Sequence, residues 1–303
     1  MNLWTQVDSN KRRSVFLIAF FILLVSGLGW VFSYYYNSYA IFIFAIILAV
    51  TQGLISFYSG DKIVLATSGA QKIQKKDSPE LWNIVENLSI TAGIPMPNVY
   101  IIADPAPNAF ATGRDPKHAS IAVTTGLLER LDKNELQGVI AHELSHVGNY
   151  DIRVMTIVVI LVGVIAFASD IFLRSQWFGF GRKSEREGNG GQILAILAIV
   201  AAILAPIVAT IIQLAVSRKR EFLADADGAL LTRYPEGLAS ALEKISSYKE
   251  PVEHASSSTA HLYIANPLGS KEDGEGDGQS FFQKIFSTHP PIKERIKILR
   301  QSL

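Results

Sequence analysis

The feature that most constrains the fold is a long uncharged segment: no Asp, Glu, Lys or Arg occurs between Ser14 and Ser59. It contains two apolar stretches, at roughly 14–36 and 38–58, and each is about long enough to cross a hydrocarbon core of ~30 Å as a helix. Tyrosines followed by an asparagine and a serine separate them, which is typical of a tight turn at the aromatic interface of a membrane. We therefore expect residues 1–59 to form an N-terminal membrane hairpin.

A cleaved signal peptide is the alternative for this segment. Its apolar core would be only about 7–15 residues long and would end at a cleavage site between small residues. The segment is longer than that, and its first stretch leads directly into the second. Lys11, Arg12 and Arg13 precede the first stretch, and such residues favour the cytoplasmic side. We therefore expect both ends of the hairpin to lie in the cytoplasm.

Outside the apolar stretches the composition is that of an ordinary soluble protein. The 303 residues are 49% hydrophobic and 18% charged, and the net charge is +1. Neither a charge excess nor a basic patch with interleaved aromatic residues occurs, so we expect no nucleic-acid partner. Cysteine is absent, which excludes disulfide bonds, thiolate metal ligands and a cysteine nucleophile. A transition-metal site would have to use His, Asp and Glu.

Residues 60–152 have the patterns of a water-exposed unit with helices and a small sheet. Apolar spacing indicates a helix around 80–88, and a β-type run follows at 99–102. The segments 108–113 and 119–124 are expected to be two short strands, because charged residues and a proline suited to a turn separate them.

Asp132 and Glu135 form a capping box, which predicts a helix that begins there and continues through His146. Within this helix, His142, Glu143 and His146 form an HExxH sequence. Residues four apart lie on one helix face, so both imidazoles can reach one metal ion at about 2.0–2.1 Å, with Glu143 angled toward a water on that metal. The alternative is a buried helix whose three polar side chains would each need another partner.

A catalytic zinc site needs a third protein ligand and an open fourth position. In the metzincin pattern the third ligand is a histidine six residues after the second, preceded by a glycine, but Ile152 and Asn149 occupy these positions. Glu221 and Asp225 are again four residues apart on one expected helix. We expect Glu221 to be the third ligand and Asp225 to accept a hydrogen bond from a ligand histidine. The alternative for Glu221 is a surface carboxylate paired with Arg218.

Two further apolar stretches, at roughly 154–173 and 191–216, separate the two halves of this site. They are either two membrane spans or buried helices of a large domain, and both arrangements return the chain to the same side. We expect a second membrane hairpin over 153–216, which would give a four-helix anchor, and a C-terminal catalytic part over 217–303. The basic residues of the connecting loop conflict with its expected place outside the cell; they are Arg174, Arg182, Lys183 and Arg186.

Taken together, these motifs resemble the HtpX family of bacterial membrane heat-shock proteases, which are relatives of the CaaX prenyl proteases. The resemblance covers nearly the whole chain. It is carried by the two N-terminal apolar stretches, the HELSH segment, and the segments 107–113, 220–225 and 288–291, with Glu294 and Arg295.

The resemblance implies a zinc endopeptidase with one Zn²⁺ per chain, in a mainly helical gluzincin-type core with a small sheet. It implies a multi-pass protein of the bacterial inner membrane whose active site faces the cytoplasm. It also implies a stress-response role in the removal of misfolded or damaged membrane proteins and unfolded polypeptides, and possible self-cleavage.

The segment formed by Asn108, Ala109, Phe110 and Ala111 matches the edge strand of the family, to which an extended peptide can add by main-chain hydrogen bonds. An ordinary core strand is the alternative. His289 would donate a hydrogen bond to the developing oxyanion, and Arg295 would orient Glu143 or another carboxylate of the site. The alternative is a helix that starts near His289 and leaves Arg295 exposed. The remaining histidines are expected in loops or at the surface; they are His118, His254 and His261.

In this hypothesis Glu143 accepts a proton from the attacking water and passes it to the leaving amine. Two other classes of protein stay open. A metal transporter should place ionisable residues inside its spans, and the apolar stretches contain almost none. A silent scaffold would need a broken site, whereas Glu143 is present.

Overall fold

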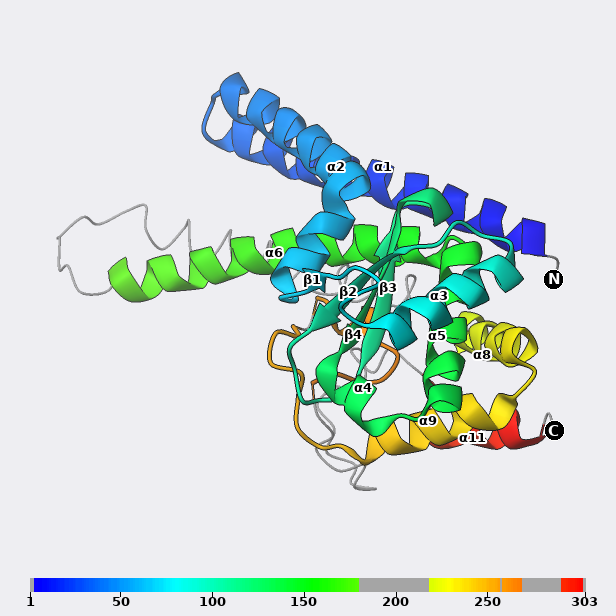
Figure 1. The fold of residues 1–303 in the computed structure, drawn as a ribbon. Coiled ribbons are helices and arrows are strands. Elements are labelled where there is room, and N and C mark those ends of the chain that lie inside the picture. The colour runs from blue at the N-terminus through cyan, green and yellow to red at the C-terminus, as the bar shows by residue number, and fades with distance from the viewer. Residues whose placement is uncertain (1–2, 180–217, 257, 269–289, 302–303) are drawn as a thin grey trace.

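The computed structural model describes residues 3–179, 218–256, 258–268 and 290–301 (Figure 1). The described chain is mainly helical and contains one small mixed sheet, as expected. It begins with α1 (Leu3–Tyr35), α2 (Tyr39–Thr67), β1 (Gln71–Lys72), α3 (Pro79–Ala92), β2 (Asn98–Ile102), β3 (Ala109–Gly113), η1 (Pro116–His118), β4 (Ala119–Thr124) and α4 (Thr125–Arg130). It continues with α5 (Lys133–Gly148), α6 (Asp151–Gly179), α8 (Arg218–Thr232), α9 (Pro235–Ser247), η2 (Ala260–Leu262) and α11 (Ile292–Gln301).

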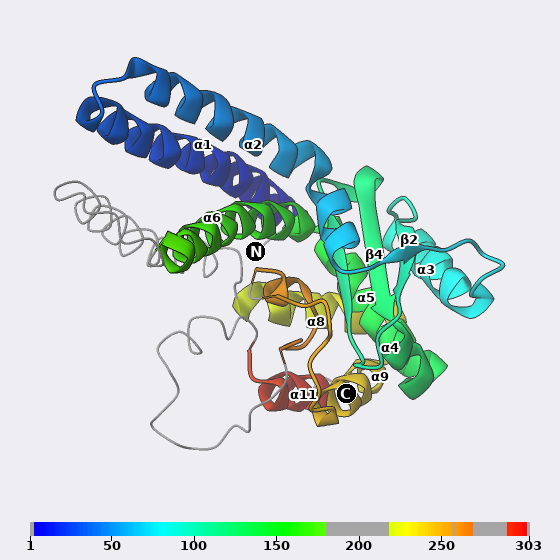
Figure 2. The same cartoon turned by 90° about the vertical axis from the view of Figure 1, so that its left-hand side faces the viewer.

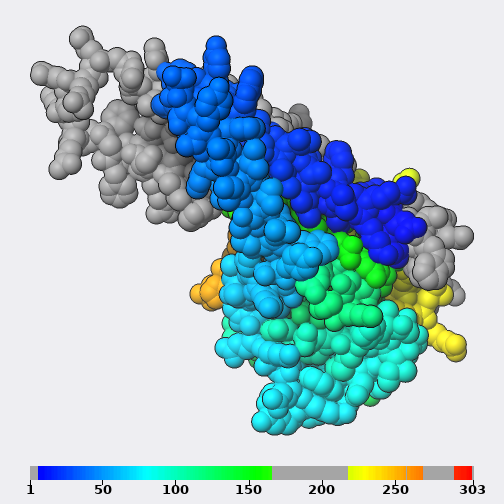
Figure 3. Space-filling view, turned by 90° about the horizontal axis from the view of Figure 1, so that it is seen from above, coloured from blue at the N-terminus to red at the C-terminus, as the bar shows by residue number. Residues whose placement is uncertain are grey.

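The hairpin of α1 and α2 projects from the rest of the protein, and its two helices lie side by side (Figures 1 and 2). The segments Gln6–Tyr35 and Tyr39–Thr67 are long and apolar enough to cross a membrane. In the space-filling view the far end of the hairpin extends past the body of the molecule (Figure 3). Large apolar side chains there are exposed, such as Leu23 at 72% and Phe44 at 65%. Contact between this apolar surface and water is unfavourable, and a lipid bilayer would cover the surface.

The sheet has the strand order β1-β2-β4-β3. Strands β2 and β4 are parallel, whereas β1 and β3 run antiparallel to their neighbours. The strands expected at 99–102, 108–113 and 119–124 are confirmed. Strand β3 lies at the edge of the sheet and packs against α5. The HExxH helix therefore runs beside a strand that has one side not paired to the sheet.

Helix α5 is the buried centre of the body and packs between the sheet, α3, α8 and α9 (Figure 2). Its capping box is confirmed: Asp132 Oδ1 accepts from the backbone N–H groups of Asn134 and Glu135, and Glu135 Oε2 accepts from that of Asp132. Gly228 on α8 allows a close approach, because a Cβ there would lie 3.0 Å from the backbone nitrogen of His142. The backbone of α8 is thereby held against the metal-binding turn of α5.

The chain reverses sharply after α5. Helices α5 and α6 meet at 84°, and the turn between them contains Tyr150 with a φ of 61°. A left-handed conformation is rare for a residue with a bulky side chain and persists where the surroundings hold it. The first turns of α6 then pack against α1, with Val154, Ile157 and Leu161 buried beside Leu17.

The membrane anchor differs from the expected four helices. Two membrane-capable helices occur in the described ranges, and a third candidate exists only if α5 and the first part of α6 count as one bent span. Helix α2 continues to Thr67, beyond the expected boundary of the hairpin at residue 59. The stretch at 191–216 lies outside the described residues. The four-helix anchor is therefore not confirmed and stays a prediction.

Candidate active site

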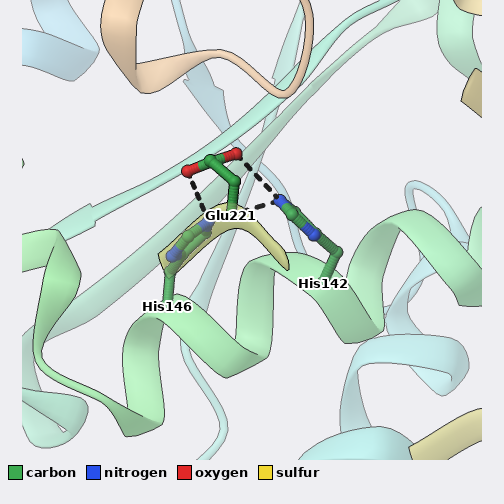
Figure 4. Close-up of side chains that lie close together, drawn as sticks. All are labelled: His142, His146 and Glu221. Carbon is green, nitrogen blue, oxygen red and sulfur yellow. Dashed lines mark hydrogen bonds and ion pairs between the residues drawn. The ribbon is translucent and has the colours of Figure 1, made fainter. Parts of the chain in front are cut away.

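Three ligand atoms converge where α5 and α8 meet (Figure 4). The Nε2 atoms of His142 and His146 are 3.2 Å apart. The Glu221 carboxylate lies 3.9 Å from His142 Nε2 through one oxygen and 3.6 Å from His146 Nε2 through the other. All three side chains are buried. Ligand atoms around a tetrahedral zinc with bonds of about 2.0–2.1 Å would be about 3.3 Å apart.

The proton positions of the two imidazoles show why this cluster fits a cation. His142 Nδ1 is 3.0 Å from Asp225 Oδ1, and His146 Nδ1 is 3.1 Å from Asp151 Oδ2. A carboxylate only accepts, so each Nδ1 carries the donated proton in the neutral ring. When both rings are neutral, both Nε2 atoms direct lone pairs into the space between them, as metal binding requires. His142, His146 and Glu221 are therefore able to hold a metal ion.

Arg295 supports the His142 side of the site. It donates from Nε and Nη2 to the two oxygens of Asp225, at 2.8 and 2.6 Å, and it is fully buried. Burial alone would raise the pKa of Asp225, but the Arg295 guanidinium lowers it to about 2. Asp225 is thus a permanent anion that accepts from His142. The structure places Arg295 on Asp225 rather than on Glu143, the other carboxylate considered from the sequence.

Asp151 is a site residue that sequence reasoning missed. Its Oδ2 accepts from His146, while its Oδ1 lies 2.7 Å from Asn10 Nδ2 and 3.4 Å from Arg220 Nη1. Asp151 follows His146 by five residues, so the two side chains would not lie on the same face of one continuous helix. The left-handed turn at Tyr150 carries it back to the imidazole, and the sequence gives no local signal for that turn.

Glu143 lies beside the metal ligands and is buried. Burial raises the pKa of Glu143 to about 7. The backbone N–H of Ala111 on β3 donates to its carboxylate. A carboxylate with a pKa near neutrality is suited to accept a proton and release it again in one reaction.

The predicted peptide-binding residues lie at the edge of the sheet, next to the site. They are Asn108, Ala109, Phe110 and Ala111, and they are buried. The side of β3 not paired to the sheet contacts the chain's own segment 262–265. There the backbone N–H of Ile264 donates to the carbonyl of Ala109 at 3.0 Å, and Phe110 forms an antiparallel bridge with Tyr263.

The histidines outside the HExxH sequence have different fates. His289 lies outside the described residues, so its expected role at the oxyanion stays a prediction. His261 is not at the surface: it is fully buried in η2, with Nε2 3.2 Å from the carbonyl oxygen of Met155. The sequence around His261 is short and polar and does not indicate that this segment packs inward against β3 and α6.

Comparisons with known proteins show the family of the chain. The model of peptidase family M48 matches residues 75–303. The chain belongs to peptidase family M48. It is 48% identical over 299 residues to a "Protease HtpX homolog" of Tropheryma whipplei (strain TW08/27), which covers 99% of this chain and 98% of the relative. It is 47% identical over 294 residues to a "Protease HtpX homolog" of Caldanaerobacter subterraneus subsp. tengcongensis, which covers 96% and 95%.

The expected resemblance to HtpX-type proteases is thus confirmed. A crystal structure of S. mikatae Ste24p has a TM-score of 0.47 and 17% identity over 98% of this chain and 66% of that chain. This M48 peptidase is a metalloprotease with membrane-capable helices, and its His142, His146 and Glu221 lie close enough together to hold a metal ion.

Metal binding should release a proton. Burial alone would lower the pKa of His146, but its hydrogen bond to Asp151 and the charge of Glu221 raise it to about 9. Below that pH the metal must displace a proton from His146, so the apparent affinity for Zn²⁺ should fall about tenfold per pH unit. Titration calorimetry of the metal-free protein at pH 7, in two buffers of different ionisation enthalpy, should show about one proton released per Zn²⁺. A Zn²⁺ affinity independent of pH between 6 and 8 would contradict this. The Glu129→Gln variant, whose altered side chain is exposed, is the control and should show the same pH dependence as wild type.

Proposed function

We propose that this M48 peptidase is a zinc-dependent endopeptidase of the cytoplasmic membrane, which cleaves misfolded or damaged membrane proteins and unfolded polypeptides. The observation that carries the proposal is the buried group of His142, His146 and Glu221 with Glu143 beside it, attached to an exposed apolar hairpin. Two imidazole nitrogens and one carboxylate are a ligand set typical of catalytic zinc. When bound, zinc would lower the pKa of a water toward 7 and polarise the scissile carbonyl.

The residues of the chain supply the proton transfers and the positioning. Glu143 accepts the proton of the attacking water and delivers it to the leaving amine, for which its pKa of about 7 is suited. The Ala111 N–H holds the Glu143 carboxylate toward the site. Asp225, held by Arg295, keeps His142 in the tautomer that leaves Nε2 free to bind the metal. His289 is proposed to donate to the oxyanion.

We propose that substrates bind as extended segments along β3, at Asn108 to Ala111, by main-chain hydrogen bonds. This mode reads the backbone and needs an unfolded stretch of chain, which damaged proteins provide. The apolar surface of α1 and α2 supports a place at the bilayer, where misfolded membrane proteins occur. A stress-response role and self-cleavage fit the same chemistry, and no nucleic-acid partner is proposed.

We also propose that the active site faces the cytoplasm from the inner membrane in a multi-pass protein. Lys11, Arg12 and Arg13 lie near the start of α1 and favour the cytoplasmic side. Asn10 is one residue before them and contacts Asp151 of the site. The site is thus joined to the end of α1 that the positive charges keep in the cytoplasm.

Glu143→Gln should separate metal binding from catalysis. In detergent-solubilised full-length protein, the variant should retain about one zinc by elemental analysis, because Glu143 is not a ligand. Its rate of casein cleavage should fall by about 10²–10⁴-fold, the typical contribution of a general base. Exposed Glu129→Gln on α4 is the matched control and should cleave at the wild-type rate. Cleavage by Glu143→Gln near the wild-type rate would remove Glu143 from the role of base.

The proposed topology is testable because the chain contains no native cysteine. A single Asn37→Cys substitution lies in the turn between α1 and α2. It should react with a membrane-impermeant maleimide in cells whose cytoplasmic membrane is intact but whose outer layers let the reagent through. Glu129→Cys in the body should react only after the cytoplasmic membrane is opened. Lys183→Cys tests the expected second hairpin and should react like Asn37→Cys. Labelling of Glu129→Cys in intact cells would place the site on the opposite side.

A further inference from the structure

Asn10 links the first membrane helix to the metal site. Its Nδ2 donates to Asp151 Oδ1 at 2.7 Å and to the carbonyl oxygen of Asn149 at 2.9 Å, and its Oδ1 accepts from Arg220 Nη1 at 3.3 Å. The side chain is fully buried. One amide thus joins the end of α5, the start of α6 and the start of α8. The partners lie immediately around His146 and Glu221, but Asn10 itself precedes the segment matched by the family model, 75–303.

The same helix also holds the strained turn that carries Asp151. Tyr150 adopts its left-handed conformation between Asn149 and Asp151, the two residues that accept from Asn10. Lys11 Nζ lies 4.8 Å from the centre of the Tyr150 ring, in a cation–π contact. A left-handed non-glycine residue costs about 1–3 kcal/mol and persists when several contacts hold it. Contacts from α1 supply several of these restraints.

We propose that Asn10 is a positioning residue of the metal site, which acts through Asp151 on His146. With Asn10 in place, one oxygen of Asp151 is occupied by Asn10 and Arg220, and the other is directed at His146 Nδ1. Without it, Asp151 loses its shortest hydrogen bond and the Tyr150 turn loses a restraint. The metal affinity of the site then depends on the correct docking of α1, so a chain whose hairpin is misplaced holds its metal poorly.

The test measures zinc affinity directly, by competition with a chromophoric chelator on full-length protein in detergent. Asn10→Asp is the first variant, because it keeps the shape of the side chain but puts an oxygen where a donor faced Asp151. Asn10→Ala is the second. Loss of a group that supports a ligand typically weakens metal binding by about 10–100-fold, and we expect a change in this range. Ser14→Ala is the matched control: Ser14 is buried one turn later on α1 and donates only to the carbonyl of Asn10.

A second readout separates positioning from general damage. If Asn10 acts through the metal site, excess Zn²⁺ should restore cleavage of casein by the Asn10 variants, even where loss of the buried hydrogen bonds of Asn10 lowers the melting temperature of the metal-free protein. Wild-type zinc affinity in Asn10→Asp would overturn the proposal, as would weakened activity that added Zn²⁺ does not restore.

A different observation concerns the segment Leu262–Ala265, which we call the strap. It lies along β3 as an extended peptide would, antiparallel and with the Ile264 N–H on the Ala109 carbonyl. Asn108 Nδ2 donates to the carbonyl oxygen of Ala265 at 3.1 Å. The strap therefore engages the edge of the sheet through its backbone, which is the mode of recognition proposed for substrates.

The strap is also joined to the metal site. Arg295, which holds Asp225, donates from Nη1 to the carbonyl oxygen of Ile264 at 3.0 Å. The Ile264 side chain is buried in the apolar cluster that contains Val139 and Ile140 of the HExxH helix. Tyr263 packs edge-on against Phe110, with ring centres 5.0 Å apart. The strap is thus held by backbone, side-chain and guanidinium contacts.

We infer that the strap is an internal occupant of the peptide path and must leave β3 before a substrate can bind. This inference rests on the proposed function, because it assumes that substrates use the same edge. Substrate can bind only to molecules in which the strap has left β3. The apparent affinity for substrate is therefore reduced in proportion to the fraction of molecules whose path is free. Folded, intact neighbours would not displace it, whereas a long unfolded segment can compete.

Hydrogen exchange tests the strap without altering it. Zinc-loaded Glu143→Gln protein should bind reduced casein without cutting it, and the amides of 262–265 should then exchange faster, while those of β4 at Ala119–Thr124 stay protected. Unchanged exchange of the strap in the presence of bound casein would overturn the inference. Failure of wild type to cleave casein would instead count against the proposed function.

Discussion

The two imidazole nitrogens that face each other at 3.2 Å set the conditions that the rest of the site has to meet. Each ring must keep its proton on the far nitrogen, and it does so by donating to an aspartate. Each aspartate must in turn stay ionised although it is buried, which requires its own donors. Arg295 provides them for Asp225, and Asn10 with Arg220 provides them for Asp151. Buried charges are therefore paired at every step outward from the metal ligands.

These supports come from opposite ends of the chain. His142 depends on α8 and α11, whereas His146 depends on the start of α6 and on α1. Only the HExxH sequence is local, and each of its ligands is completed by a segment far away in sequence. The full set of supports is therefore in place only when the hairpin has docked against α6 and the C-terminal helices have docked around α5. Such long-range closure suits a peptidase that should not be active before it is in place.

The sequence predicted those features that depend on local spacing. The HExxH turn, the capping box at Asp132 and the short strands follow from periodicities that tertiary structure did not override. Asp151 and Asn10 could not be predicted, because a left-handed turn and a contact across 141 residues bring them together. The burial of His261 was missed for a similar reason, since nothing in its irregular segment marks the face that packs inward. The expected four-helix anchor rested on hydropathy, which does not distinguish a span from the protein-buried first turns of α6.

The strap over β3 also affects how readily the protein can aggregate. A bare edge strand offers unpaired N–H and C=O groups to any other strand and is a common starting point for aggregation. Here the Ile264 and Phe110 contacts satisfy part of that edge with the chain itself. An uncovered β3 would present these groups to strands of other proteins and of other copies of this chain. The strap therefore leaves fewer unpaired backbone groups at this edge for such contacts.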